Sequence, residues 1–107
     1  MQITINHHGY HGWHQVTVRS FSVRDGWAWV SPRVARRINR AVCLPGDCQC
    51  GSRIACEVAQ GAWAIPLPRT EAEAEDFCAE YNYRSIQVGE RRGGTIALDL
   101  VDDRASN

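Results

Sequence analysis

The sequence predicts an α+β domain in which an antiparallel sheet, built from hairpins, packs with two helices. Three observations predict this class. Several short segments alternate apolar and polar residues as strands do, and two segments repeat apolar residues at helical spacing. Turn-forming Asp-Gly, Gln-Gly and Gly-Gly pairs separate neighbouring strands. The chain of 107 residues has the length of one domain, which we assign to residues 1–101, followed by a polar C-terminal tail at 102–107.

The chain is expected to open with two strands. Ile3 and Ile5 alternate with polar neighbours, and Val16 and Val18 do the same on the returning segment. Residues 7–12 between them contain two glycines, which favour a loop.

Asp25-Gly26 predicts a two-residue hairpin turn that leads into a short strand, Trp27–Val30, with both tryptophans on one face. A helix over about 32–43 follows. Ser31 is a good N-cap, and Pro32 suits the first helical position. The apolar stripe of this helix is expected to comprise Val34, Ile38, Ala41 and Val42.

Two further strands are predicted at 54–58 and 62–67, joined at Gln60-Gly61. Pro66 and Pro68 each lack a backbone donor, which favours an edge position for the second of these strands.

The second helix is expected over about 71–82. Thr70 and Glu73 have the spacing of a capping box. The apolar stripe comprises Ala74, Phe77, Cys78 and Tyr81. A last hairpin pairs Ile86 and Val88 with residues 96–100 across Gly93-Gly94.

The charge balance excludes some functions. All 12 basic residues are arginine, so a Schiff-base lysine and a P-loop lysine are excluded. The 12 acidic residues cancel this charge, which argues against a protein that coats nucleic acid with its whole surface. No apolar run is long enough to span a membrane, and no signal peptide is visible at the N-terminus. We therefore expect a cytoplasmic protein with no membrane partner.

The five cysteines support two interpretations. An odd number in a reducing compartment argues against a disulfide framework. Cys43, Cys48, Cys50 and Cys56 could supply four thiolates to a zinc ion, although their spacing lacks the usual close pairs. The other interpretation is small buried thiols without a cofactor, and the alternation of Cys56 with Ile54 favours it for that residue.

All four histidines lie between residues 7 and 14. Imidazole is the commonest metal ligand, so a metal-binding loop is one interpretation. A polar hairpin loop is another, and a partner contact that gains charge near pH 6 is a third. No pairing of a cysteine with a histidine resembles a known nucleophile motif, so we expect no enzymatic activity.

Two helix faces carry concentrated charge. The first helix has arginines at i, i+3, i+4 and i+7, and their mutual repulsion is offset if they meet carboxylates, phosphate or an acidic protein. These arginines are Arg33, Arg36, Arg37 and Arg40. The second helix carries carboxylates that either are solvated or imitate the phosphates of a nucleic acid. Those proposed for partner binding are Glu71, Glu73, Asp76 and Glu80. The tryptophans are expected mostly in the core, with one or two left for a partner surface.

Three segments of the chain resemble small proteins of bacteriophages and mobile elements. They are Ile3–Gly12, the helix segment Ser31–Arg40 and the loop Cys43–Gly51. Within that group the chain looks most like the single-domain anti-CRISPR inhibitors. This resemblance implies a non-enzymatic protein of the host bacterial cytoplasm that binds a Cas effector subunit and blocks DNA binding or nuclease recruitment.

We therefore expect a non-enzymatic binding protein, most specifically a phage-encoded inhibitor that docks on a host CRISPR–Cas effector complex. One alternative is a small nucleic-acid-binding regulator that uses the arginines of the first helix, with or without a Cys/His zinc site. Another is a metal-binding enzyme or redox protein at the Cys/His clusters. Either a monomer or a homodimer is compatible with the sequence.

Overall fold

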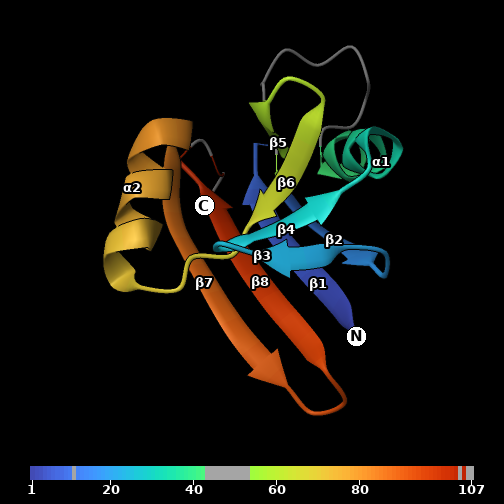
Figure 1. Cartoon of the computed structure of the whole chain (residues 1–107). Coiled ribbons are helices and arrows are strands. Elements are labelled where there is room, and N and C mark those ends of the chain that lie inside the picture. The colour runs from blue at the N-terminus through green and yellow to red at the C-terminus, as the bar shows by residue number, and fades with distance from the viewer. Residues whose placement is uncertain (11, 43–53, 104, 106–107) are drawn as a thin grey trace.

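The computed structural model of the chain describes residues 1–10, 12–42, 54–103 and 105. Its two helices and two sheets confirm the predicted α+β class (Figure 1). The elements in chain order are β1 (Gln2–Gly9), β2 (Gly12–Val18), β3 (Ser22–Arg24), β4 (Trp27–Val30), α1 (Pro32–Val42), β5 (Cys56–Ala59), β6 (Ala62–Pro66), α2 (Glu71–Tyr81), β7 (Tyr83–Arg91) and β8 (Thr95–Asp102).

The arrangement of strands differs from the single antiparallel sheet that the sequence predicted. The strands form two four-stranded sheets, one in the order β2-β1-β8-β7 and the other in the order β3-β4-β6-β5. In the first sheet β1 and β8 run parallel, with Ile5 opposite Leu98. Turn residues specify which neighbouring strands form hairpins, but they carry no information on how one hairpin pairs with another. Joining the first and last hairpins side by side placed their two inner strands parallel.

The first sheet buries one face and exposes much of the other. Ile3, Ile5 and Leu98 are fully buried and share the inner face with Val16 and Val18. Polar side chains occupy the opposite face, where Asn6 Nδ2 donates to Asp99 Oδ1 over 2.8 Å and Gln15 Nε2 donates to Asn6 Oδ1 over 2.9 Å. A sheet with one solvated face produces this alternation.

The second sheet and both helices complete one core with that inner face. Ala28 of β4, Ile65 of β6 and Ile38 of α1 are fully buried in the same cluster as Phe77 of α2. The two helices lie on opposite sides of the second sheet, α1 against β2 and β6, and α2 against β7 (Figure 1).

The edge position predicted for the Pro66 segment is wrong, because β6 lies between β4 and β5. Pro66 is tolerated there because it is the last residue of β6, opposite Trp27 at the start of β4. Just beyond it, Leu67 N donates to Gly26 O over 2.8 Å, so the segment that follows β6 is held against the β3–β4 turn.

That turn is formed by Asp25 and Gly26, as the sequence predicted. Both residues have positive φ, 55° and 81°, and the flanking pair is Arg24 opposite Trp27. These are the features of a two-residue turn that requires left-handed backbone at both central positions.

The cap of α1 is also as expected. Ser31 Oγ accepts a hydrogen bond from Val34 N over 3.2 Å, and Ser31 O accepts one from Ala35 N over 2.9 Å. Ala35 and Ile38 are fully buried, whereas Val34 is only partly buried. The buried stripe therefore includes Ala35, which the predicted stripe did not contain.

A clamp that the sequence did not reveal holds α1 to the chain before β5. The Asn39 side chain accepts hydrogen bonds from Ile54 N and Ala55 N, both over 2.9 Å, and donates one to Ala55 O over 3.0 Å. Ile54 and Ala55 are fully buried, so a side chain supplies partners that water cannot.

Helix α2 begins and ends at residues that satisfy its backbone. Thr70 Oγ1 accepts from Glu73 N over 3.2 Å, as in the predicted capping box. The Glu73 carboxylate, however, accepts from Arg69 N over 2.9 Å, one residue earlier than the reciprocal bond of a capping box. Asn82 ends the helix in the left-handed conformation, with φ 59°.

At the C-terminus, Asp102 is the last residue of β8 and is 1% exposed, although the sequence analysis placed it in the polar tail.

Candidate functional site

The structure presents two separate charged surfaces. The first is the arginine face of α1, formed by Arg33, Arg36, Arg37 and Arg40, all of which are exposed. Together with Val34 they border an open groove of about 380 Å³. Ala35 and Ile38 anchor the opposite side of the helix in the core, so packing turns the arginines toward solvent.

Within the described part of the chain, few groups neutralise the positive charge of the arginine face. Arg37 Nη2 donates to Thr17 O over 3.4 Å, but none of the described carboxylates forms an ion pair with this face. The first turn of α1 contains no acidic residue, and Arg33 in that turn faces the positive end of the helix dipole, whereas the dipole favours Arg40 in the last turn. Neighbouring like charges at i,i+4 cost a few tenths of a kcal/mol per pair. A partner that supplies negative charge would offset these costs.

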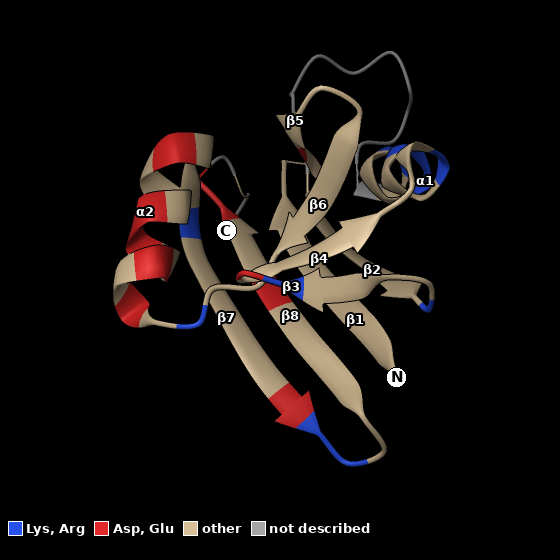
Figure 2. Cartoon of the chain, in the orientation of Figure 1, with Lys and Arg blue, Asp and Glu red and all other residues tan. Residues whose placement is uncertain are grey.

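Pairing of this face with the acidic helix does not occur. Figure 2 shows α1 and α2 on opposite sides of the molecule, with the second sheet between them. The arginine face and the carboxylates of α2 are therefore independent surfaces.

The carboxylates of α2 differ in how far the fold compensates their negative charge. Glu71 and Glu73 lie in the first turn, where negative charge is favoured by the helix dipole. Glu73 is also ion-paired with Arg69, the Nη2 to Oε2 distance being 2.9 Å. The hydrogen bonds from Arg69 lower the pKa of Glu73 from 4.5 to about 2.

Asp76 and Glu80 lack such compensation. They are one helical turn apart, a like-charge spacing that is unfavourable. Glu80 is also in the last turn, where the dipole favours cations. Among the described residues, neither carboxylate has a hydrogen-bond or ion-pair partner.

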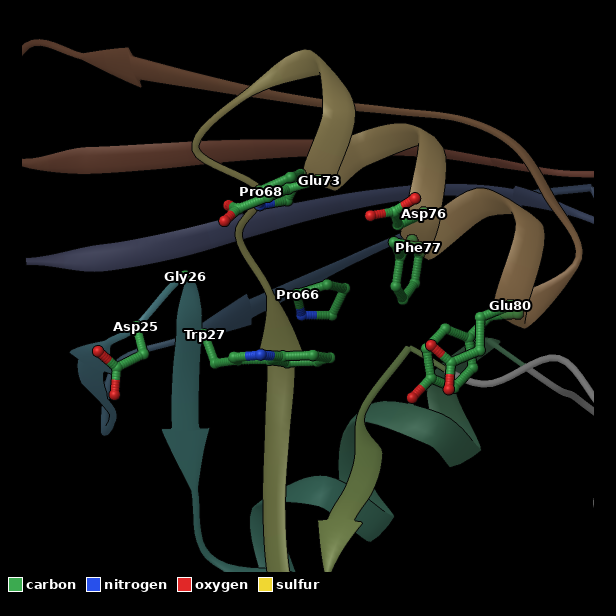
Figure 3. A pocket seen from close by; sticks show the side chains of 10 residues that line it. Asp25, Gly26, Trp27, Pro66, Pro68, Glu73, Asp76, Phe77 and Glu80 are labelled. Carbon is green, nitrogen blue, oxygen red and sulfur yellow. The ribbon is translucent and has the colours of Figure 1, made fainter.

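These two carboxylates border a pocket of about 190 Å³, the acidic–aromatic pocket (Figure 3). It lies where α2, the β3–β4 turn and the end of β6 meet. The lining residues are Asp25, Gly26, Trp27, Pro66, Pro68, Glu73, Asp76, Phe77, Glu80 and Tyr81. Apolar rings form its walls, and carboxylates lie at its rim from both sides.

Local contacts hold the walls of this pocket in place. Phe77 packs on Tyr81 and on Tyr83 of β7, with ring centroids 4.8 Å and 5.3 Å apart. The β3–β4 turn sits against the Arg69–Glu73 ion pair so closely that a Cβ on Gly26 would lie 3.3 Å from Arg69 Nε. The pocket therefore depends on contacts between three segments.

The four tryptophans differ in their exposure to solvent. Trp27 and Trp63 are partly buried against the core and Trp29 is partly buried, whereas Trp13 is 55% exposed, in line with the expectation that one or two tryptophans remain at the surface. On β4, the ring of Trp29 is covered by Arg24, whose guanidinium carbon lies 4.7 Å from the ring centroid.

The proposed zinc ligands are only partly described. Cys43, Cys48 and Cys50 lie outside the described residues. Cys56 is 7% exposed, and its Sγ donates to Ile54 O over 3.7 Å, in agreement with the core position that its alternation favoured. No group of three or more metal-ligating side chains occurs within the described residues.

His7, His8 and His14 lie in strands, and His11 lies outside the described residues, so the loop predicted for residues 7–12 is wrong over most of its described length. His7 faces the core and is fully buried, with its Nε2 3.4 Å from the Tyr83 hydroxyl. His14 lies opposite it on β2, whereas His8 is exposed and packs near Trp13. Strand alternation separates these side chains onto two faces, which a loop would not do.

The membrane prediction agrees with the described helices, neither of which has the length and apolar character to span a bilayer. Comparison of the chain with protein-family models, with curated proteins and with solved structures gives no match.

Proposed function

We propose that this protein is a non-enzymatic binding protein that docks through the arginine face of α1 on an acidic surface of a larger protein. The observation that carries the proposal is the face itself. Four exposed arginines project from one side of a helix whose other side is fixed in the core, and no described carboxylate pairs with them. Arginine is enriched at protein interfaces because its planar fork binds carboxylates with defined geometry.

The specific partner that we propose is a subunit of a CRISPR–Cas effector complex in the host bacterial cytoplasm. The support for this step is the resemblance of the chain to small anti-CRISPR inhibitors, together with its small size and its docking face. The protein would act by occupying a surface that the effector needs for DNA binding or nuclease recruitment.

The alternative is a nucleic-acid-binding regulator that uses the same arginines for phosphates. The arginine face lies on a single 11-residue helix, and the net charge of the whole chain is zero. The protein therefore offers few contacts to phosphates. Binding by so few contacts would be weak at physiological salt and would weaken further as salt rises. The acidic-protein interpretation is therefore the one that we favour.

The test is co-purification of the tagged protein with Cas effector complexes from bacteria that express them, before and after nuclease treatment, with subunits identified by mass spectrometry. Arg36→Glu combined with Arg40→Glu is expected to abolish recovery of Cas subunits. The matched control is Arg91→Glu with Arg92→Glu, which makes the same charge change at the β7–β8 turn, remote from α1 (Figure 2). Circular dichroism of each variant verifies folding.

Nuclease-resistant recovery that is lost only in the α1 variant supports the proposal. Failure of the wild-type protein to recover any Cas subunit refutes the CRISPR–Cas assignment, and undiminished recovery with the α1 variant refutes the docking face. Recovery of nucleic acid alone, lost on nuclease treatment, establishes the regulator instead.

A further inference from the structure

The acidic–aromatic pocket has a composition that selects for one kind of chemical group. Its walls include Trp27, Phe77 and Tyr81, with Pro66 between the first two in the view of Figure 3. Its rim carries Asp76 and Glu80 on the side of α2 and Asp25 on the side of the β3–β4 turn. Aromatic faces attract cations through the ring quadrupole, and carboxylates attract them directly. A cation with an apolar or planar surface satisfies both parts of the lining.

The size of the pocket further limits which ligands can occupy it. Sites for drug-sized molecules and cofactors usually measure about 300–1,000 Å³. The volume here, about 190 Å³, is smaller than that range and suits a single side chain. The pocket is open at its rim, so a side chain presented by another molecule can enter it.

Between the two basic side chains, arginine fits the lining better than lysine. The guanidinium group is planar, stacks on aromatic rings, and binds carboxylates through two parallel donors. The same strand already shows this interaction within the chain, since Arg24 covers the ring of Trp29 at 4.7 Å. Trp27 lies on the same face of β4, two residues earlier, and no described cation covers its ring.

The unfavourable placement of two carboxylates supports a charged occupant. Asp76 and Glu80 repel each other at i,i+4, and Glu80 opposes the helix dipole. Neither has a described partner, whereas Glu73, at the same pocket, already binds Arg69. An entering guanidinium would supply the cation that the fold does not.

We propose that the acidic–aromatic pocket binds an arginine side chain presented by a protein partner. The partly exposed ring of Trp27 stacks on the guanidinium plane, Phe77 forms the wall beside it, and Asp76 and Glu80 accept its hydrogen bonds. This site is distinct from the arginine face, because the two share no lining residue and α1 and α2 lie on opposite sides of the second sheet (Figure 2).

The test is an NMR titration of the full chain with N-acetyl-arginine amide. The probe is expected to shift the resonances of the Trp27 indole and the Phe77 ring in a saturable manner. N-acetyl-citrulline amide, which has the same shape without the charge, is expected to leave them unchanged. N-acetyl-lysine amide is expected to bind more weakly than the arginine probe.

The matched variants change the net charge equally on the same helix. Asp76→Asn with Glu80→Gln is expected to weaken binding about fivefold, because each exposed ion pair contributes modestly. Glu71→Gln with Glu75→Gln removes two carboxylates that do not line the pocket and is expected to change affinity less than about twofold.

Three results would overturn the proposal. The first is the absence of shifts at Trp27 and Phe77 with the arginine probe. The second is an equal loss of affinity in both double variants, which would show that net charge alone attracts the probe. The third is tighter binding of spermidine than of the arginine probe at the same resonances, which would make a free polycation the occupant.

Discussion

The Asn39 clamp allows a quantitative test of how α1 is held in place. In the Asn39→Ala variant, Ile54 N, Ala55 N and Ala55 O all lose their partner. Each hydrogen bond contributes about 1 kcal/mol net, so the three together contribute about 3 kcal/mol. Alanine recovers roughly 0.6 kcal/mol through its better helix propensity. The expected loss in the free energy of unfolding is therefore about 2.5 kcal/mol.

Urea denaturation followed by far-UV circular dichroism measures this loss. With a typical slope of about 1–3 kcal/mol per molar urea, the midpoint should fall by roughly 0.8–2.5 M. The control is Arg36→Ala on the exposed side of the same helix, which is expected to change stability by no more than about 0.5 kcal/mol.

Hydrogen exchange provides a second readout at the bonds themselves. The Ile54 and Ala55 amides should be protected in the wild-type protein and should exchange faster in Asn39→Ala than the amides of β1 do. A loss below about 1 kcal/mol, with both amides still protected, would show that solvent or a local rearrangement replaces the clamp and that our reasoning is wrong.

Two other predictions concern a charge and a close contact. The pKa of Glu73 is lowered to about 2 from 4.5, so its ion pair with Arg69 stabilises the fold above pH 4.5 and is lost as the pH falls toward 2. Thermal unfolding of Glu73→Gln should show a lower midpoint than wild type at neutral pH but the same midpoint near pH 2, and a constant difference would contradict the assignment. In Gly9→Ala, the new Cβ would lie 2.5 Å from Cε1 of the fully buried His7, so we expect a loss of about 1–3 kcal/mol. Gly89→Ala, which meets nothing within 4 Å, should be nearly neutral in the same urea assay, and equal losses in the two variants would refute the role of the contact.

Much of the local structure could be predicted because its determinants are adjacent in the chain. Ser31 and Thr70 cap their helices as their neighbours indicated, and the Asp25-Gly26 pair forms the expected turn. Capping and tight turns depend on a few consecutive residues, so the sequence contains the whole interaction. The four arginines of α1 are exposed for a similar reason, since helical spacing separates them from the apolar stripe.

The interactions between segments could not be predicted in the same way. His7, which was predicted to lie in a loop, is a buried residue of β1, because β1 pairs with β8 as far as His8 and with β2 as far as Gly9. Nothing near Asn39 in the sequence indicated that it would bind the backbone of Ile54 and Ala55. An asparagine on a helix can face solvent equally well, and only the approach of a distant segment decides its partner.

The sequence by itself determined the α+β class, the two capped helices, the hairpin turns and the charged face of each helix, because these follow from spacing within one segment. Tertiary structure alone decided that the strands divide into two sheets, that the two charged helices lie on opposite sides, and that Trp27 meets the carboxylates of α2 in a pocket. Burial of apolar surface brings these segments together, and it acts on the whole chain without regard to sequence separation.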